Sequence, residues 1–141
     1  GDGTLSVQLA KLVYRGDLQA FDENKNNLTA TRQKFKNSRL TNVKAKEIKD
    51  SHLPIKDQTI DLATLSYLSD RVEDPKKIIA EAVRALRPSG WIVIIDREVD
   101  ISKLSVSVEN YKKIADKLKL KFNMKHNLSD EDYLLTFTFR K

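Results

Sequence analysis

The chain has 141 residues, of which 40% are hydrophobic, and a formal net charge of +6 at pH 7; this length suits one compact domain and excludes two full-sized ones. It contains no cysteine, which excludes disulfides, cysteine-bound zinc and a thiol nucleophile. No apolar run approaches the roughly 20 residues that cross a bilayer, and residues 1–30 lack the blocks of a secretory signal, so we expect a cytoplasmic protein without a membrane partner.

The first part of the chain predicts two helices and two strands. A helix is expected over residues 4–13, because apolar side chains recur there at helical spacing. Its buried stripe is predicted to consist of Leu5, Leu9, Leu12 and Val13. After a turn at Gly16, a strand over 17–22, a helix over 24–36 and a strand over 42–48 are expected. The residues of the second helix expected to point inward are Leu28 and Phe35.

The middle of the chain has stronger apolar segments. Strands are predicted over residues 59–68 and 91–96, and the second, "WIVIID", is continuously apolar, as in a parallel strand with helices on both faces. The helix between them has Pro75 near its start and "RPSG" (87–90) after its end. Its apolar face is predicted to consist of Ile78, Ile79, Ala82, Val83 and Leu86.

The last part of the chain predicts a helix and a hairpin. The buried face of that helix is expected to consist of Tyr111, Ile114, Ala115 and Leu118. Residues 120–126 and 132–141 each alternate apolar with polar, and "NLSDE" (127–131) supplies the turn of an antiparallel hairpin at a sheet edge. Upstream, strands and helices alternate, which predicts an α/β fold with a mostly parallel sheet and helices on both faces, in one domain over residues 1–141.

Polar residues at the predicted strand ends form the candidate site, because ligands of open parallel sheets bind beyond the C-terminal ends of the strands. The turn Gly1-Asp2-Gly3-Thr4 precedes the first helix. Glycine lets the backbone approach a ligand, and the helix amino end presents free N–H groups. Asp22 follows Gly3 by 19 residues, at a strand end where a carboxylate accepts hydrogen bonds from a ribose diol. The alternative for Asp22 is a solvated turn residue or a helix cap.

Five stretches, in this order and spacing, resemble the class I S-adenosylmethionine-dependent methyltransferases, in particular a branch that modifies small molecules. They are "GDGT" (1–4), "AFDEN" (20–24), "HLPIKDQTIDLATLSYL" (52–68), "VEDPKKIIAEAVRALRPSGWIVIID" (72–96) and "DYLLTFTF" (132–139). The resemblance is close over residues 1–96, and the final helix and hairpin suit the same fold. It implies a Rossmann-like methyltransferase fold and S-adenosylmethionine as the cofactor.

The resemblance also implies roles for the residues of the first two strand ends. Gly1 and Gly3 would face the methionine part of the cofactor, Asp22 would hold the ribose hydroxyls, and Glu23 would lie beside it. The third glycine of the family turn is replaced by Leu5, whose side chain crowds the cofactor or joins the helix stripe.

Three further positions complete the implied cofactor site. The family often has an acidic residue before "LP" that reaches the adenine amino group; the aligned residue here is Lys49, and Asp50 serves if the loop shifts by one residue. Ser66 and Tyr67, at the end of the strand over 59–68, would border the transferred methyl group.

The first strand of the family and the acidic residue near its end would precede Gly1. Without that strand, two neighbouring strands carry unpaired backbone groups, which are costly when buried. Three explanations are open: the sequence is a fragment of a longer protein, the fold is rebuilt, or another chain supplies the strand, including another copy in a homo-oligomer. The fragment explanation is favoured.

The chemistry of methyl transfer assigns few residues. It is an in-line displacement in which the protein mainly aligns donor and acceptor and excludes water, so no catalytic residue is assigned. His52 and His126 lack the spacing of a metal site, and no metal is expected. Asp70 and Asp96 lie near strand ends and either touch substrate or cap a loop.

Two other functions remain as alternatives. Leu5, Lys49 and the missing strand favour a non-catalytic binding or scaffold domain with a degenerate cofactor site. The net charge of +6 leaves a nucleic-acid partner open, but the lysines are spread along the chain, as is typical of solvated helix faces. The favoured function is methyl transfer from S-adenosylmethionine to a small molecule.

Overall fold

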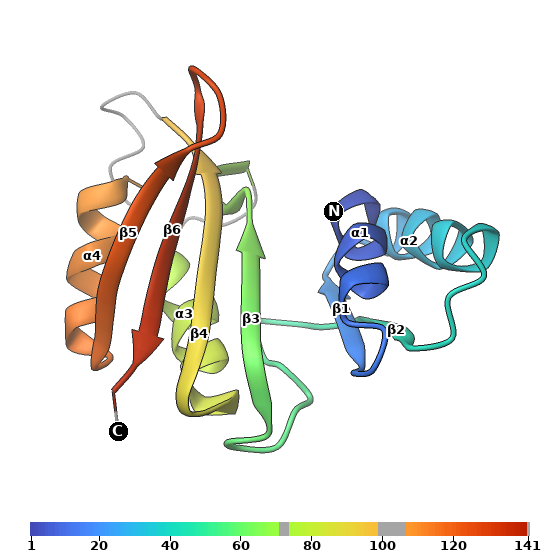
Figure 1. Ribbon diagram of the computed structural model, residues 1–141, viewed down its shortest axis with the longest axis horizontal. Coiled ribbons are helices and arrows are strands. Elements are labelled where there is room, and N and C mark those ends of the chain that lie inside the picture. Colours follow the sequence, from blue (N-terminus) through green and yellow to red (C-terminus); the bar gives the residue numbers. More distant parts are fainter. Residues whose placement is uncertain (71–73, 99–106, 141) are drawn as a thin grey trace. The chain divides into compact units, whose positions relative to one another are not determined.

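The computed structural model describes residues 1–70, 74–98 and 107–140, which form two compact units, Gly1–Leu53 and Pro54–Lys141 (Figure 1). The boundary lies in the segment between the second and third strands of the chain.

The first unit is a two-stranded parallel sheet with two helices. Its elements in chain order are α1 (Thr4–Leu12), β1 (Leu18–Asp22), α2 (Lys25–Asn37) and β2 (Val43–Glu47). β1 and β2 run in parallel, with Leu18 opposite Val43 and Asp22 opposite Glu47. α2 begins after Asn24, whose side chain accepts hydrogen bonds from the N–H groups of Asn26 and Asn27 and so satisfies two of the free donors at the helix start.

Packing in the first unit confirms the inward side of α2 and corrects that of α1. Leu28 and Phe35 are buried, as expected. In α1 the buried residues are Val7 and Ala10. The stripe predicted to be buried is instead largely open: Leu5 is 37%, Leu12 76% and Val13 40% exposed. The reason is that α1 packs on α2 and β1 through its smaller side chains, which leaves the leucine stripe on the outer side of this unit.

The second unit contains a mixed four-stranded sheet. Its elements are β3 (Ile60–Ser66), the 3-10 turn η1 (Leu68–Asp70), α3 (Pro75–Ala85), β4 (Leu86–Arg97), α4 (Val108–Lys117), β5 (Leu120–Asn127) and β6 (Asp132–Phe139). The strand order is β3-β4-β6-β5, in which β3 and β4 are parallel and β6 is antiparallel to both of its neighbours (Figure 1). The hairpin of β5 and β6 is therefore confirmed, with β5 at the edge.

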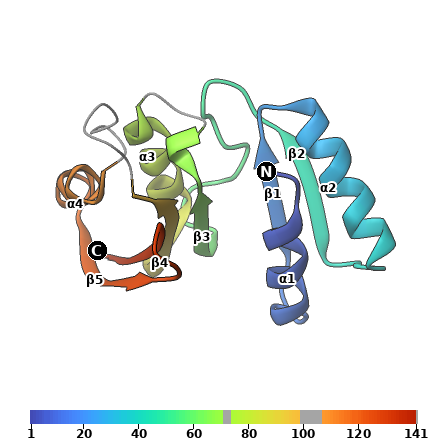
Figure 2. The same ribbon diagram turned by 90° about the horizontal axis from the view of Figure 1, so that it is seen from above.

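The helices α3 and α4 lie against the same face of this sheet (Figure 2). The side chains of β4 and β6 that point to this face are fully buried, among them Ile92, Ile94, Leu135 and Phe137. On the other face, Trp91 is 45% exposed, and Val93 and Ile95 are half-buried. The continuous apolar run of 91–96 thus alternates between a fully buried and a partly open face within this unit.

The segment "RPSG" (87–90) follows the end of α3, as predicted, and it lies within a strand. These residues belong to β4, which begins directly at Leu86, opposite Ile60, and pairs again from Trp91, opposite Leu62. The four residues between them form a bulge, and Ser89 has a positive φ of 67°. Gly90 is needed there, because a Cβ would lie 2.9 Å from the carbonyl oxygen of Arg87.

Four strands lie at a sheet edge among residues 1–70, 74–98 and 107–140: β1 and β2 in the first unit, and β3 and β5 in the second. β1 pairs with β2 alone, and β3 pairs with β4 alone. Within the same described residues, every helix is too short or too polar to traverse a lipid bilayer.

Candidate functional site

The glycine turn stands at the amino end of α1. Gly3 is the residue before the helix and has a left-handed φ of 85°, which favours glycine. The Asp2 carboxylate accepts hydrogen bonds from the N–H and the hydroxyl of Thr4, both at 3.1 Å, and an ion pair joins it to Lys34 of α2. The hydrogen bond from Lys34, followed by those from Thr4, lowers the pKa of Asp2 well below its usual value.

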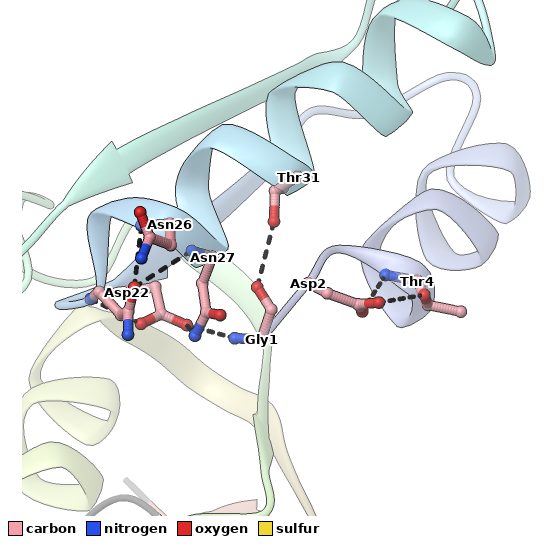
Figure 3. A network of polar contacts seen from close by, with 8 residues as sticks. Gly1, Asp2, Thr4, Asp22, Asn26, Asn27 and Thr31 are labelled. Carbon is pink, nitrogen blue, oxygen red and sulfur yellow. Dashed lines mark hydrogen bonds and ion pairs between the residues drawn. The ribbon is translucent and has the colours of Figure 1, made fainter.

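Asp22 meets this turn from the end of β1. Its Oδ2 atom contacts the Gly1 nitrogen and accepts a hydrogen bond of 3.1 Å from the Asn27 side chain, while Oδ1 accepts one of 2.8 Å from the Asn24 N–H (Figure 3). Burial alone would raise the pKa of Asp22, but these hydrogen bonds lower it below its usual value. The Asp22 carboxylate is therefore adjacent to the glycine turn.

Helix α2 holds the turn from its other side. The Thr31 hydroxyl donates a hydrogen bond of 3.2 Å to the Gly1 carbonyl oxygen (Figure 3). A Cβ on Gly3 would lie 2.8 Å from the Thr31 Cα and Oγ1 atoms. Gly3 is thus required both by its backbone conformation and by the close approach of α2.

Glu23 and Asp50 are connected through the loop that follows β2. The Glu23 Oε1 atom accepts a hydrogen bond of 3.0 Å from the Ser51 N–H, next to Asp50. Asp50 and Ser51 both have positive φ values, 51° and 60°, and an isolated bridge joins Lys49 to His52. The exposed Asp50 therefore lies on a tight loop. Glu23 stabilises this loop through its hydrogen bond to the Ser51 N–H.

Leu5 stands where the family turn would have its third glycine. It is on the open side of α1, with 37% of its surface exposed. Within the first unit it therefore contributes to the exposed stripe of α1 and not to the core.

Ser66 and Tyr67 belong to the second unit, at the end of β3. Tyr67 has a left-handed φ of 51°, and its N–H donates a 2.7 Å hydrogen bond to the carbonyl oxygen of Ile95 in β4. The Arg97 guanidinium lies 5.0 Å from the centre of the Tyr67 ring and 3.6 Å from the Asp70 carboxylate. Asp70 thus pairs with an arginine at this strand end.

Asp96 has a different environment from the one expected of a substrate contact. It is completely buried and accepts hydrogen bonds from the Ser69 N–H, the Ser69 hydroxyl, the Arg97 N–H and the Tyr111 hydroxyl. Of the two roles expected for Asp96, contact with substrate or capping of a loop, the structure supports the second: Asp96 caps the turn η1. The sequence did contain a signal for this burial. Side chains alternate between the two faces of a strand, so Asp96 lies on the same face of β4 as Ile92 and Ile94.

No cluster of three or more histidine, aspartate and glutamate side chains with the arrangement of a metal site occurs among the described residues. His52 and His126 are both exposed and lie in different units.

Comparisons with known proteins decide what kind of domain carries this turn and this carboxylate. The family described as "Methyltransferase domain" matches residues 1–94. This chain belongs to that family. The prediction of a methyltransferase domain is thereby confirmed.

Curated relatives of this methyltransferase domain include quinone-modifying enzymes. The demethylmenaquinone methyltransferase of Lactobacillus johnsonii is 30% identical over 98 residues, which are 68% of this chain and 40% of the relative. The ubiquinone/menaquinone biosynthesis C-methyltransferase UbiE of a Marinomonas species is 31% identical over 98 residues, 68% of this chain and 39% of that relative. The chain thus spans about 40% of the length of these relatives.

Solved structures confirm the predicted Rossmann-like methyltransferase fold. A SAM-dependent methyltransferase from Aquifex aeolicus is similar with a TM-score of 0.85 and 18% identity, over 99% of this chain and 78% of that one. The [4+2]-cyclase SpnF has the same TM-score of 0.85 at 11% identity, over 99% of this methyltransferase domain and 72% of the cyclase. At these identities the likeness establishes the fold.

Proposed function

We propose that this chain binds S-adenosylmethionine and transfers its methyl group to a small molecule. The observation that carries the proposal is the meeting of the Gly1 to Gly3 turn with the ionised Asp22 at the amino end of α1. A carboxylate beside a glycine turn suits the ribose hydroxyls and the amino-acid part of this cofactor. The glycine turn and the Asp22 carboxylate of the first unit therefore fit S-adenosylmethionine, the cofactor that the family resemblance implies.

The residues of the chain would have separate tasks in this function. S-adenosylmethionine, when bound, supplies a methyl group on a positively charged sulfur. Asp22 would accept hydrogen bonds from the ribose, and Gly3 would let the backbone lie close to the methionine part. Asp50, on the loop held by Glu23, would face the adenine amino group.

The family resemblance also implies a task for Ser66 and Tyr67, next to the transferred methyl group. Ser66 is the last residue of β3, and Tyr67 follows it directly. Their task is to exclude water and to fix the direction of approach, because an in-line displacement depends mainly on alignment. The family match over residues 1–94 includes parts of both units, which supports one methyltransferase-like domain over residues 1–141.

The acceptor class follows from the relatives and is part of the proposal. One of them is named as a demethylmenaquinone methyltransferase, and another as a ubiquinone/menaquinone biosynthesis C-methyltransferase. A reduced quinone has an electron-rich ring carbon, which can form the bond to the methyl carbon as the sulfur–methyl bond breaks and the ring carbon loses a proton. We therefore propose a reduced quinone or a similar small aromatic as the acceptor, in the cytoplasm.

A non-catalytic binding domain remains the second candidate, because Leu5 and Lys49 occupy places where the family has a glycine and an acidic residue. The likeness to the cyclase SpnF also illustrates that one fold can carry different reactions. This candidate predicts cofactor binding or a folded scaffold without methyl transfer.

The test uses the natural polypeptide and the variants Asp22→Asn and Asp17→Asn. Calorimetry with S-adenosylhomocysteine should show binding, and Asp22→Asn should weaken it about 10- to 100-fold, the usual effect of losing hydrogen bonds to a charged group. Asp17 is exposed at the other end of β1 and serves as the control, with unchanged affinity.

Methyl transfer is measured with radiolabelled S-adenosylmethionine and 1,4-naphthohydroquinone as the acceptor probe. Binding with transfer supports the proposed enzyme. Binding without transfer to this probe or to a panel of phenols favours the non-catalytic domain, and absence of cofactor binding rejects both roles for the Asp22 site.

A further inference from the structure

The Asp96 carboxylate is buried at the end of β4 and accepts several hydrogen bonds. Its exposed fraction is 0%, and no lysine or arginine of residues 1–70, 74–98 and 107–140 forms an ion pair with it. A buried carboxylate without such a partner must be stabilised by donors that point at its oxygens. The groups that donate hydrogen bonds to Asp96 must therefore keep fixed positions around its two oxygen atoms.

Four donors from three elements surround the carboxylate. Oδ2 accepts from the Ser69 N–H at 3.0 Å and from the Tyr111 hydroxyl at 2.6 Å. Oδ1 accepts from the Arg97 N–H at 2.9 Å and from the Ser69 hydroxyl. The carboxylate thus ties η1, which follows β3, to the end of β4 and to α4.

The segment that Asp96 ties down begins with a strained residue. Tyr67 has a φ of 51°, a conformation that a residue with a large side chain adopts only when its surroundings impose it. The Tyr67 N–H is bonded to Ile95, and the Asp70 N–H is bonded to the Tyr67 carbonyl oxygen at 3.2 Å. Ser69, two residues after Tyr67, donates hydrogen bonds to Asp96 from both its backbone N–H and its hydroxyl.

The residue after Asp96 acts on the same turn from the opposite side of the strand. The Arg97 guanidinium lies 5.0 Å from the centre of the Tyr67 ring and 3.6 Å from Asp70. Because neighbouring residues of a strand point to opposite faces, Asp96 holds the turn from the interior and Arg97 contacts its outer side. The conformation of Tyr67 to Asp70 is therefore determined from two directions.

We propose that Asp96 is a positioning residue for methyl transfer: through Ser69 it fixes the turn from Tyr67 to Asp70, and so the placement of the Ser66 and Tyr67 side chains beside the reacting group. The proposal rests on the proposed methyltransferase function for its kinetic consequence. Its structural part, that Asp96 sets the conformation of this turn, is measurable without any ligand.

Three variants test the proposal. Tyr111→Phe removes one donor and keeps the carboxylate, and Ser69→Ala removes the hydroxyl donor but keeps the N–H. Asp96→Asn replaces one oxygen by an amide nitrogen, so that at least one of the two backbone N–H groups loses its acceptor. The control is Ile114→Val, a buried change in α4 that lowers stability without touching the carboxylate.

The first readout is native-state amide hydrogen exchange followed by NMR. The ratio of the Ser69 exchange rate to that of Ile94, in the middle of β4, should rise about tenfold in Tyr111→Phe and more in Asp96→Asn. In Ile114→Val the ratio should stay constant, because a global loss of stability affects both amides. Unchanged ratios in Tyr111→Phe and Ser69→Ala would overturn the proposal even where Asp96→Asn does not fold.

The second readout separates binding from turnover in the natural polypeptide. With S-adenosylmethionine and 1,4-naphthohydroquinone, kcat should fall about 10- to 100-fold in Asp96→Asn, since small misplacements of aligning groups cost that much. The Kd of S-adenosylhomocysteine should change less than about threefold, because the proposed ribose and methionine contacts are in the first unit.

The remaining outcomes are also decisive. A kcat that falls no further than in Ile114→Val would overturn the proposal, since Asp96 would then only stabilise the fold. If the wild-type protein transfers no methyl group, the proposed function fails, and the exchange ratio alone decides whether Asp96 holds the turn.

Discussion

Gly3, in the turn before α1, lies so close to Thr31 of α2 that a Cβ on Gly3 would come within 2.8 Å of the Thr31 Cα atom. Backbone atoms cannot move away as a flexible side chain can. The same Gly3 has a φ of 85°. The turn that faces the proposed cofactor is therefore shaped by the packing of two helices.

Gly3→Ala should lower the free energy of unfolding by about 2–4 kcal/mol, because it combines a left-handed alanine with an overpacked contact. Urea unfolding of both proteins measures the change. Gly16→Ala is the matched control: its Cβ would lie 3.6 Å from the Val13 carbonyl oxygen, an ordinary contact, so an effect within about 0.5 kcal/mol is expected. Equal effects of the two substitutions would contradict the role given to Thr31.

Because of Tyr111, the free energy of unfolding should be lower at alkaline pH than at neutral pH. Burial, followed by the hydrogen bond to Asp96, raises the pKa of Tyr111 far above its usual value. Above about pH 10 the unfolded chain loses this proton while the folded chain keeps it, so the free energy of unfolding falls as pH rises.

Tyr111→Phe removes this contribution. Above about pH 11, where the unfolded side chain is almost fully deprotonated, the slope of unfolding free energy against pH should become less negative by about 1.4 kcal/mol per pH unit, the value for one proton. Urea titrations at several pH values measure it. Tyr14→Phe is the control, because 71% of that side chain is exposed in the folded protein; a slope identical in wild type and Tyr111→Phe would refute the prediction.

Thr136 carries a buried hydroxyl whose oxygen has no hydrogen-bond partner among the described residues. Valine has nearly the same shape and no polar atom, so Thr136→Val should raise the free energy of unfolding by about 1 kcal/mol. Thermal unfolding would record the gain as a higher Tm.

The control for Thr136 lies two residues along the same strand. The Thr138 hydroxyl oxygen accepts a hydrogen bond of 2.7 Å from the Asn123 side chain. Thr138→Val should therefore be neutral or destabilising by up to about 1 kcal/mol. A Tm that falls in Thr136→Val would show that its hydroxyl is satisfied in solution.

The sequence by itself determined the elements and the family. Helix α2 with Leu28 and Phe35 inward, helix α3 with Pro75 at its start, and the hairpin of β5 and β6 all follow from local periodicity and turn chemistry, which act over a few residues. The closeness of the glycine turn and Asp22 follows from the order and spacing of these two motifs in the family that the sequence resembles.

Only the tertiary structure decided which side of an element is buried when two sides are possible. The leucine stripe of α1 is open, since Val7 and Ala10 allow a closer approach to α2 than leucines would. Asp96 resembles a free strand-end carboxylate in the sequence, and it is buried because Ser69 and Tyr111, from distant segments, supply donors that no local pattern reveals. The local spacing of apolar residues determines whether a segment forms a helix or a strand. Burial and hydrogen-bond partners depend on which segments meet in space.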